Sequence, residues 1–328
     1  MTAIRRTALR CGALIASVAA VAALAGCGSH APAPTRAATH RVVHEFGVSD
    51  IPDRPKAVVA LDEYAAMDLL ALGIVPRAVF TGYGSTIAQT VLRDAGSDVI
   101  DIPVGSTIDV DTVLGRRPDL VVFSSGGDRK AYDRLAPVVP TLPLTSVQTA
   151  WRKRIETIGA ELRRESEAEH VVDVLVRRLT AVQSSGGKTI AVLMSYAGTL
   201  AGLSGDAPLN GLLADAGMTT PAAERRTGTG RQPYLPLSPE HLADHDADVV
   251  AVFAEGVYSA DAVRNQPTFP LLTGHAVNVD GDMWFGTFPF AVYWILADLA
   301  AIERNDWSHV ASAKDAPVRY RQFQEAIG

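Results

Sequence analysis

The chain has 328 residues, of which 48% are hydrophobic and 20% charged, and its formal net charge is −6. A chain of this length can bury a hydrophobic core without disulfide bonds. Its acidic balance disfavours nucleic acid as a partner, because the phosphates would be repelled. Only two cysteines occur, Cys11 and Cys27.

The first 26 residues have the features of an export signal. Arginines precede an uncharged apolar stretch that ends in Leu24-Ala25-Gly26-Cys27. A basic start, a short apolar segment and small residues before a cleavage point are typical of signal peptides. The apolar stretch is too short to span a bilayer comfortably as a helix. Cleavage before Cys27 would remove three arginines and no acidic residue, and would change the net charge from −6 to −9.

The tetrapeptide that ends in Cys27 resembles the lipobox of bacterial lipoproteins, in which the cysteine is acylated and becomes the first residue of the mature protein. The resemblance implies a lipoprotein signal peptide at residues 1–26. It also implies that lipidated Cys27 anchors the exported protein to the cell membrane, facing the periplasm or the cell exterior. Residues 27–41 are rich in Ser, Ala, Pro and Thr, and we expect them to form a flexible tether. The export route, general secretory or twin-arginine, stays open.

From residue 42 onward, short apolar runs alternate with helical patterns. The continuous runs are rich in β-branched residues, which suits parallel strands buried on both faces; they lie at residues 58–61, 120–123, 189–193 and 249–253. The apolar residues between 67 and 72 indicate a helix that stops at Gly73. This alternation predicts an α/β fold with mostly parallel sheets, and about 300 residues suffice for two Rossmann-like lobes.

Residues 150–185 are expected to join the lobes as one long helix. From Trp151 to Val182, apolar residues recur at spacings of three, four and seven. This periodicity predicts an amphipathic helix of about 45 Å, at 1.5 Å per residue. A polar gap leaves open two shorter helices that break near Glu165. The expected domains are an N-terminal lobe at 42–149, the linking helix at 150–185 and a C-terminal lobe at 186–328.

The enzyme motifs are incomplete. Gly82-x-Gly84 lacks the third glycine of a dinucleotide-binding fingerprint. The stretch Gly202-Leu203-Ser204-Gly205-Asp206 lacks the closing glycine of a nucleophile elbow. We therefore expect no catalytic residues, although a lipoprotein hydrolase with a dispersed Ser-His-Asp arrangement is an alternative of a different class.

A bare transition-metal site is a further alternative. His241 and His245 are four residues apart, which would place them on one helical face. Such a site would need one or two more ligands, for which Asp246 or His275 is available. We favour the simpler interpretation, a solvated helix face without metal.

Aromatic residues gather where strands are expected to end. Trp284 and Phe285 lie just after the apolar run 276–279 and before an apolar helix at 291–302. Five tyrosines lie at or near other proposed strand-to-helix turns: Tyr64, Tyr83, Tyr196, Tyr234 and Tyr258. Ligands of α/β proteins bind beyond the carboxyl ends of strands, and aromatic faces with polar ends suit a bulky, partly apolar ligand. For any single ring, core packing is the alternative.

Five segments, in order, resemble the substrate-binding lipoproteins of iron-complex ABC importers, the class that carries ferric siderophores, haem and cobalamin. They are PKAVVAL at 55–61 with LLALGIVP at 69–76, DVD at 109–111 with RPDLVV at 117–122, YDRLAPVVPT at 132–141, LSPEHL at 237–242, and WFG at 284–286. The resemblance implies two lobes joined by one long helix, with the ligand held in the cleft between them. It also implies a carrier without an intrinsic cofactor, whose partners are an ABC permease and a small iron chelate. A ferric siderophore is our first choice of cargo and haem the second, with a tyrosine phenolate as the haem ligand.

The resemblance also assigns roles to residues. In the family, the loop after the RPDLVV strand touches the ligand, as do an aromatic residue before the LSPEHL segment and the late tryptophan. Hydroxamate-type relatives have an arginine where this chain has Ser106 and Thr107, so an anionic cargo would need other cations. The expected ligand contacts are Tyr64, Tyr83, Ser125, Arg129, Tyr196, Arg225, Arg226, Arg231, Tyr234, Tyr258, Trp284 and Phe285. Asp111 and Glu240 match the acids that pair with basic residues of the permease, and helix capping is their alternative role.

Overall fold

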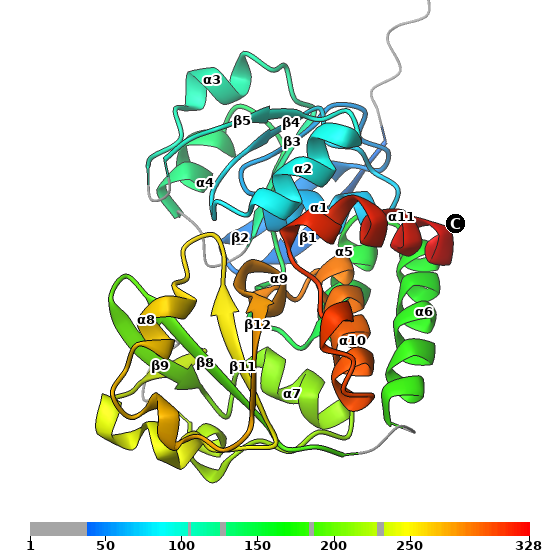
Figure 1. Cartoon of the computed structure of the whole chain (residues 1–328). Helices are drawn as coiled ribbons and strands as arrows, with labels where there is room; N and C mark the ends of the chain where they lie inside the picture. The colour runs from blue at the N-terminus through cyan, green and yellow to red at the C-terminus, as the bar shows by residue number, and fades with distance from the viewer. Residues whose placement is uncertain (1–37, 104–105, 125–128, 184–186, 228–232) are drawn as a thin grey trace, which may run out of the picture. The chain divides into compact units, whose positions relative to one another are not determined.

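The protein, seen in a computed structural model, is described over residues 38–103, 106–124, 129–183, 187–227 and 233–328 (Figure 1). Ala38–Gly328 forms one compact unit. The expected signal peptide, Cys27 and most of the expected tether lie outside the described residues.

The N-terminal lobe is built on a five-stranded parallel sheet with the order β5-β4-β3-β6-β7. Its strands are β3 (Val58–Ala60), β4 (Ala78–Phe80), β5 (Asp98–Ile100), β6 (Leu120–Ser124) and β7 (Thr141–Leu144). Every residue of β3, β4 and β6 is buried, which explains why these strands read as continuous apolar runs. The connecting helices are α1 (Glu63–Ala71), α2 (Thr86–Asp94), α3 (Val110–Leu114) and α4 (Arg129–Leu135). The helix predicted to stop at Gly73 is α1, and Gly73 has a φ of +74°, a backbone conformation that favours glycine.

An antiparallel hairpin precedes this sheet. Its strands are β1 (Thr39–His44) and β2 (Gly47–Pro52). The expected tether, residues 27–41, was therefore too long, because residues 39–41 belong to β1. Val42 and Ile51 are buried in the core, and this burial of apolar surface offsets the cost of ordering the strands.

The C-terminal lobe has a mixed sheet with the order β10-β9-β8-β11-β12. Three parallel strands, β8 (Ile190–Tyr196), β11 (Val249–Ala254) and β12 (His275–Asp280), match the predicted apolar runs. The strands β9 (Thr199–Leu203) and β10 (Tyr234–Pro236) extend the sheet in antiparallel fashion. Ala197 and Gly198, which join β8 to β9, both have positive φ (49° and 79°), as a two-residue hairpin turn requires.

The link between the lobes is two helices, α5 (Trp151–Glu161) and α6 (Glu165–Gln183). The prediction of one long helix is therefore wrong, and the alternative of a break near Glu165 is correct. Arg163 has a φ of 53°, which ends α5 because a right-handed helix cannot continue through that conformation. The turn is tight, since a Cβ atom added to Gly159 would lie 2.4 Å from the Cβ atom of Ala168.

The remaining helices pack around both sheets (Figure 1). They are α7 (Pro208–Asp215), α8 (Ala260–Arg264), α9 (Gly281–Phe285), α10 (Pro289–Glu303) and α11 (Ala316–Ile327), with short 3-10 helices η1 (Ala222–Arg225), η2 (Pro239–His245), η3 (Phe269–Leu271), η4 (Trp307–His309) and η5 (Ala313–Asp315). The α10 helix packs against α5 and α6, and α11 packs against α2 of the N-terminal lobe. A continuous set of buried apolar residues therefore connects the two lobes. Of the helices in the described residues, none has the length and apolar character needed to cross a membrane.

A buried ion pair connects α1 to α5. Arg154 of α5 donates to the carboxylate of Asp68 in α1 and to the backbone carbonyl of Thr145. Both charged side chains are almost completely buried. Burial raises the pKa of Asp68 to about 6, against the opposing effect of the Arg154 charge. The pair thus links the N-terminal lobe to the first linking helix.

Candidate functional site: a tyrosine pocket

A cavity of about 210 Å³ lies among residues of both lobes, and we call it the tyrosine pocket. It is lined by Tyr64, Tyr83, Tyr196, Tyr234, Val257, Tyr258, Asp282 and Phe285. Five phenol rings and one phenyl ring therefore surround a small space. Such a lining combines broad apolar faces with polar O–H groups at their ends.

The N-terminal lobe contributes two rings. Tyr64 lies in the first turn of α1, and Tyr83 lies in the loop after β4. Their rings stack with centroids 4.4 Å apart and planes inclined by 9°. The Phe288 ring lies 5.2 Å from that of Tyr64, so this side of the pocket rests on a residue of the C-terminal lobe.

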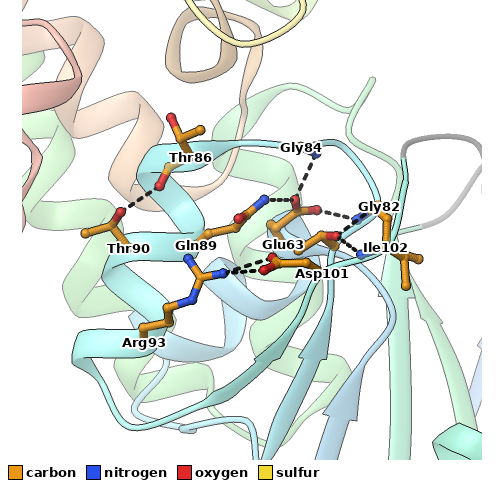
Figure 2. Close-up of polar contacts among 10 residues, drawn as sticks. Glu63, Gly82, Gly84, Thr86, Gln89, Thr90, Arg93, Asp101 and Ile102 are labelled. Atoms are coloured by element: carbon orange, nitrogen blue, oxygen red, sulfur yellow. Dashed lines mark hydrogen bonds and ion pairs between the residues drawn. The ribbon is translucent and has the colours of Figure 1, made fainter.

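The loop that carries Tyr83 is held by a buried carboxylate. Figure 2 shows Glu63, the first residue of α1, beside Gly82, Gly84 and Gln89. The backbone N–H groups of Gly82, Tyr83 and Gly84 donate to Glu63 at 2.7, 2.9 and 2.9 Å. A charged acceptor shared by three consecutive donors fixes the backbone firmly. Glu63 is thus a positioning residue for the Tyr83 ring.

The C-terminal lobe contributes rings from the carboxyl ends of three strands. Tyr196 ends β8, Tyr258 follows β11, and Phe285 lies in α9 directly after β12. Tyr196 and Tyr258 form an isolated backbone bridge, and their ring centroids are 6.1 Å apart. The pocket therefore lies where α/β sheets place their ligands.

The pocket contains a carboxylate as well as rings. Asp282 is only 4% exposed, and burial raises its pKa to about 7, assisted by the negative charges of Asp280, Glu63 and Glu255. Its neighbour Asp280 has a structural role, because it caps α9 by accepting a hydrogen bond from the Met283 backbone N–H at 2.9 Å. Asp282 has no such role in the cap.

The buried phenols keep their protons at neutral pH. Burial raises the pKa of Tyr64, Tyr83 and Tyr258, and nearby acids raise it further. Each of these groups therefore presents an O–H donor, and no phenolate is formed in advance for a metal ion.

A second hollow of about 360 Å³ adjoins the tyrosine pocket at Tyr83. It lies at the carboxyl ends of β3, β4 and β6, and its lining includes Asp62, Ser106, Thr107 and Ser124. Asp62 joins two of these strand ends, because it accepts hydrogen bonds from the backbone N–H and hydroxyl of Ser124 at 2.6 and 2.8 Å. Together the two hollows fall within the roughly 300–1,000 Å³ of small-molecule sites.

The structure separates the twelve expected contacts into three groups. The first group lines the tyrosine pocket and consists of Tyr64, Tyr83, Tyr196, Tyr234, Tyr258 and Phe285. Ser125 and Arg231 lie outside the described residues. The remaining four, Trp284, Arg129, Arg225 and Arg226, do not line this pocket.

Trp284 belongs to the core, so the prediction that it offers a stacking face to the ligand is wrong. Its side chain has no exposed surface. Its indole N–H donates to the carboxylate of Asp298 at 2.9 Å, and Arg319 contacts the same carboxylate at 2.8 Å. A ring that is enclosed in this way cannot contact a ligand in the pocket.

The structure does not bring Arg129, Arg225 or Arg226 to the tyrosine pocket. Arg129 forms an ion pair with Asp133 at 2.8 Å, and its guanidinium lies over the Phe46 ring. Arg225 donates to the backbone carbonyl of Thr220. Arg225 and Arg226 line two other hollows, which share no residue with the tyrosine pocket. We therefore withdraw these three arginines as contacts of a ligand held there.

His241 and His245 lie in different environments. His245 is buried and lies 2.8 Å from Glu224, whereas His241 is exposed and lies beside Asp244. The segment is the 3-10 helix η2, in which residues four apart do not share a face. The described residues contain no group of three or more potential ligands that could hold a metal ion. The favoured expectation of a solvated helix face is therefore wrong at His245, which is buried.

Another hollow, of about 870 Å³, lies beside η2. Its lining is largely surface, with exposed Thr199, Arg226, Ser238, His241 and Asp244. We regard it as a shallow surface depression, because a small-molecule site needs concave walls that bury most of the ligand.

Asp111 and Glu240, the expected docking acids, are both exposed. Asp111 lies in the first turn of α3, and Asp109 provides the cap of that helix. Glu240 lies in the first turn of η2. Nearby hydrogen-bond donors lower the pKa of Glu240, so its carboxylate is charged at neutral pH.

Comparison with known proteins gives a consistent result. Residues 58–273 match the family described as periplasmic binding protein. The Bacillus subtilis (strain 168) protein YfiY, named a probable siderophore-binding lipoprotein, is 24% identical over 268 residues, which cover 75% of this chain and 82% of that protein. A second protein from the same organism, the putative ABC transporter substrate-binding lipoprotein YhfQ, is 21% identical over 265 residues, or 74% of this chain and 81% of that protein.

Solved structures share the fold. Staphylococcus aureus SirA, in complex with staphyloferrin B, aligns with a TM-score of 0.66 and 18% identity, covering 81% of this chain and 99% of that chain. The catecholate-siderophore binding protein VctP from Vibrio cholerae aligns with a TM-score of 0.62 and 18% identity, covering 80% of this chain and all of that chain. The two-lobe α/β architecture predicted from the sequence is thereby confirmed.

Proposed function

Because this chain belongs to the periplasmic binding protein family, whose members bind substrates for ABC importers and are not enzymes, we propose that it captures a ferric siderophore and delivers it to an ABC permease. The tyrosine pocket carries this proposal. It lies at the carboxyl ends of strands from both lobes, and its rings and O–H groups suit a bulky, partly apolar chelate. YfiY is named a probable siderophore-binding lipoprotein, and SirA was solved in complex with staphyloferrin B. Both descriptions support the same class of cargo.

We favour a siderophore over haem. Haem binding through tyrosine needs a phenolate on the iron, and burial raises the pKa of Tyr64, Tyr83 and Tyr258, which opposes that role for these three of the five tyrosines. A siderophore brings its own iron ligands, and for it the neutral phenols serve as hydrogen-bond donors. A Soret band after purification with added hemin would reverse this preference.

Binding is tested with Tyr196→Ala. Tyr196 is 40% exposed, so its removal should hardly change stability. We expect the affinity for a bound ferric siderophore to fall by about tenfold, on the scale of a contacting aromatic residue. Tryptophan fluorescence titration measures the affinity. Unchanged affinity would remove the tyrosine pocket as the binding site.

The docking acids provide the control for delivery. The double variant Asp111→Ala, Glu240→Ala should keep the affinity of the parent, because both residues are exposed and neither lines the tyrosine pocket. Uptake of the ferric complex by cells should fall steeply. If uptake survives the double substitution, these acids only stabilise helix ends.

We also propose that Cys27 anchors the protein to the membrane, where tethering raises the local concentration of the carrier near its permease. Cys27→Ala should therefore release the protein from the membrane fraction and leave ligand affinity unchanged. Detergent partitioning of the parent and the variant measures this directly. Equal partitioning of the two proteins would contradict the lipobox interpretation.

A further inference from the structure

Asp282 is a buried carboxylate with no bonding partner among the described residues. Its side chain lines the tyrosine pocket, and the residue is only 4% exposed. The Gly256 backbone approaches so closely that a Cβ atom there would lie 2.6 Å from Asp282 Oδ2. An enclosed carboxylate without a partner is costly to charge. A ligand that supplies the missing partner would therefore gain from the contact.

The surroundings of Asp282 are negative. Asp280 at the end of β12, Glu63 on α1 and Glu255 in the loop after β11 all act on it through their charges. Of the residues that line the pocket in the described part of the chain, none is basic. Arg154, whose charge reaches Tyr83, is already paired with Asp68. The pocket thus has the charge of a cation site.

The aromatic rings also attract positively charged groups, as Asp282 does. Tyr64, Tyr83, Tyr196, Tyr234 and Tyr258 surround the space next to Asp282. Aromatic faces attract ammonium groups, and cages of several rings are a known means of binding them. A carboxylate and several aromatic rings therefore favour the same ligand group.

We infer that the tyrosine pocket selects ferric chelates that carry a positively charged ammonium group, with Asp282 as its counter-ion, and that it discriminates against polyanionic chelates. The inference rests on the proposed function and specifies its substrate class. An anionic chelate would meet Asp282 and three further acids, and none of the described residues that line the pocket carries a positive charge to balance them. The lining includes neither Arg225 nor Arg226, the described arginines that were expected to balance an anionic cargo, and it does not include Arg129.

The test compares ferric complexes of different charge. The ferric complex of desferrioxamine B carries a pendant ammonium group, and its N-acetylated form has the same iron coordination without that charge. We expect the parent protein to bind the ammonium form about tenfold more tightly at pH 8, as a charge-assisted contact allows. A ferric tris-catecholate, with three negative charges, should bind more weakly than either.

Asp282→Asn keeps the shape of the side chain and removes its charge, so the preference for the ammonium form should shrink to about twofold or less. Asp261→Asn is the matched control, because Asp261 is an exposed acid of α8 outside the pocket. The control should keep the full preference.

The pH dependence gives a readout that needs no variant. Asp282 has a pKa of about 7, so its charge is present above that pH and lost below it. Affinity for the ammonium form should fall about tenfold between pH 8 and pH 5.5, whereas affinity for the acetylated form should stay constant. Tyr64, Tyr83 and Tyr258, whose pKa values are raised, stay protonated throughout this window. Burial raises the pKa of Asp280 to about 6, so this neighbour also loses charge between pH 8 and pH 5.5 and adds to the fall.

The outcomes separate the two proposals. Equal affinity for both desferrioxamine complexes, a preference unaffected by Asp282→Asn, or tightest binding of the tris-catecholate would overturn the charge selection and leave the carrier function standing. If none of the three ferric complexes binds, the proposed function is wrong and the inference falls with it.

Discussion

Arg154→Ala is expected to lower the free energy of unfolding by about 3–5 kcal/mol, the usual cost of removing one partner of a buried ion pair. Asp68 would be left with its charge enclosed and unpaired, since both side chains are almost completely buried. The backbone carbonyl of Thr145 would also lose its donor. Urea unfolding measures the loss.

The double variant Arg154→Met, Asp68→Leu separates charge from packing. It replaces both groups with apolar side chains of similar size, which is often neutral for a buried pair. We expect most of the lost stability to return. A double variant as unstable as Arg154→Ala would show that the shape of Arg154, and not the orphaned charge, is what matters.

The loss of unfolding free energy in Arg154→Ala should also grow with pH. The pKa of Asp68 in the folded protein is about 6, above its ordinary value of 3.8, so the folded state binds more protons than the unfolded state between these values. Stability from this group therefore falls as pH rises through that range. Loss of the Arg154 charge raises the pKa of Asp68 further and moves the fall toward neutral pH. The deficit should thus be larger at pH 8 than at pH 5.

The buried parallel strands could be predicted because burial on both faces demands uninterrupted apolar residues. β6, β8 and β11 are of this kind, and the predicted runs coincide with them. β4 and β5 could not be predicted in this way, because Arg77 and Thr81 flank the three residues of β4 and an exposed Asp98 begins β5. The antiparallel strand β9 contains glycine and alanine, and its pairing depends on the turn at Ala197 and Gly198.

The break in the linking helix depends on one backbone conformation. The apolar periodicity continues across α5 and α6, because both helices bury a face against the same core. Arg163 adopts a positive φ, and an arginine in the sequence does not predict that conformation. The polar gap was the only signal, and it was compatible with either interpretation.

The place of the candidate site could be predicted from the sequence, but not which residues of α9 face it. Tyr64, Tyr83, Tyr196 and Tyr258 were found because each follows or ends a strand, a rule set by chain topology. Tyr234 begins β10, and the family resemblance pointed to it. Asp282 was missed as a pocket residue, and Trp284 was assigned to the pocket. In a helix, residues three apart share a face and adjacent residues point about 100° apart. Asp282 and Phe285 therefore face the pocket together, and Trp284 faces the core.

The substitution of Trp284 tests this division directly. Trp284→Ala is expected to cost about 3–5 kcal/mol of stability, as for other large buried aromatic residues. The ring is completely buried, and its removal leaves a cavity and takes a hydrogen-bond donor from Asp298. Burial already raises the pKa of Asp298 to about 6, so its charge depends on the donors that remain. Trp284→Phe keeps most of the volume and should cost less, about 1–3 kcal/mol, mainly for the lost indole N–H.

Phe285→Ala is the matched control, one residue along the same helix. Phe285 is partly exposed and lines the tyrosine pocket, so its removal should weaken ligand binding by about tenfold and change stability little. Urea unfolding and fluorescence titration of both variants measure the two effects separately. If Trp284→Ala keeps its stability and loses affinity instead, the indole contacts the ligand after all, and α9 must turn when the ligand binds. A stable Trp284→Ala variant with the affinity of the parent would contradict both roles, because the ring would then contribute neither to the core nor to the pocket.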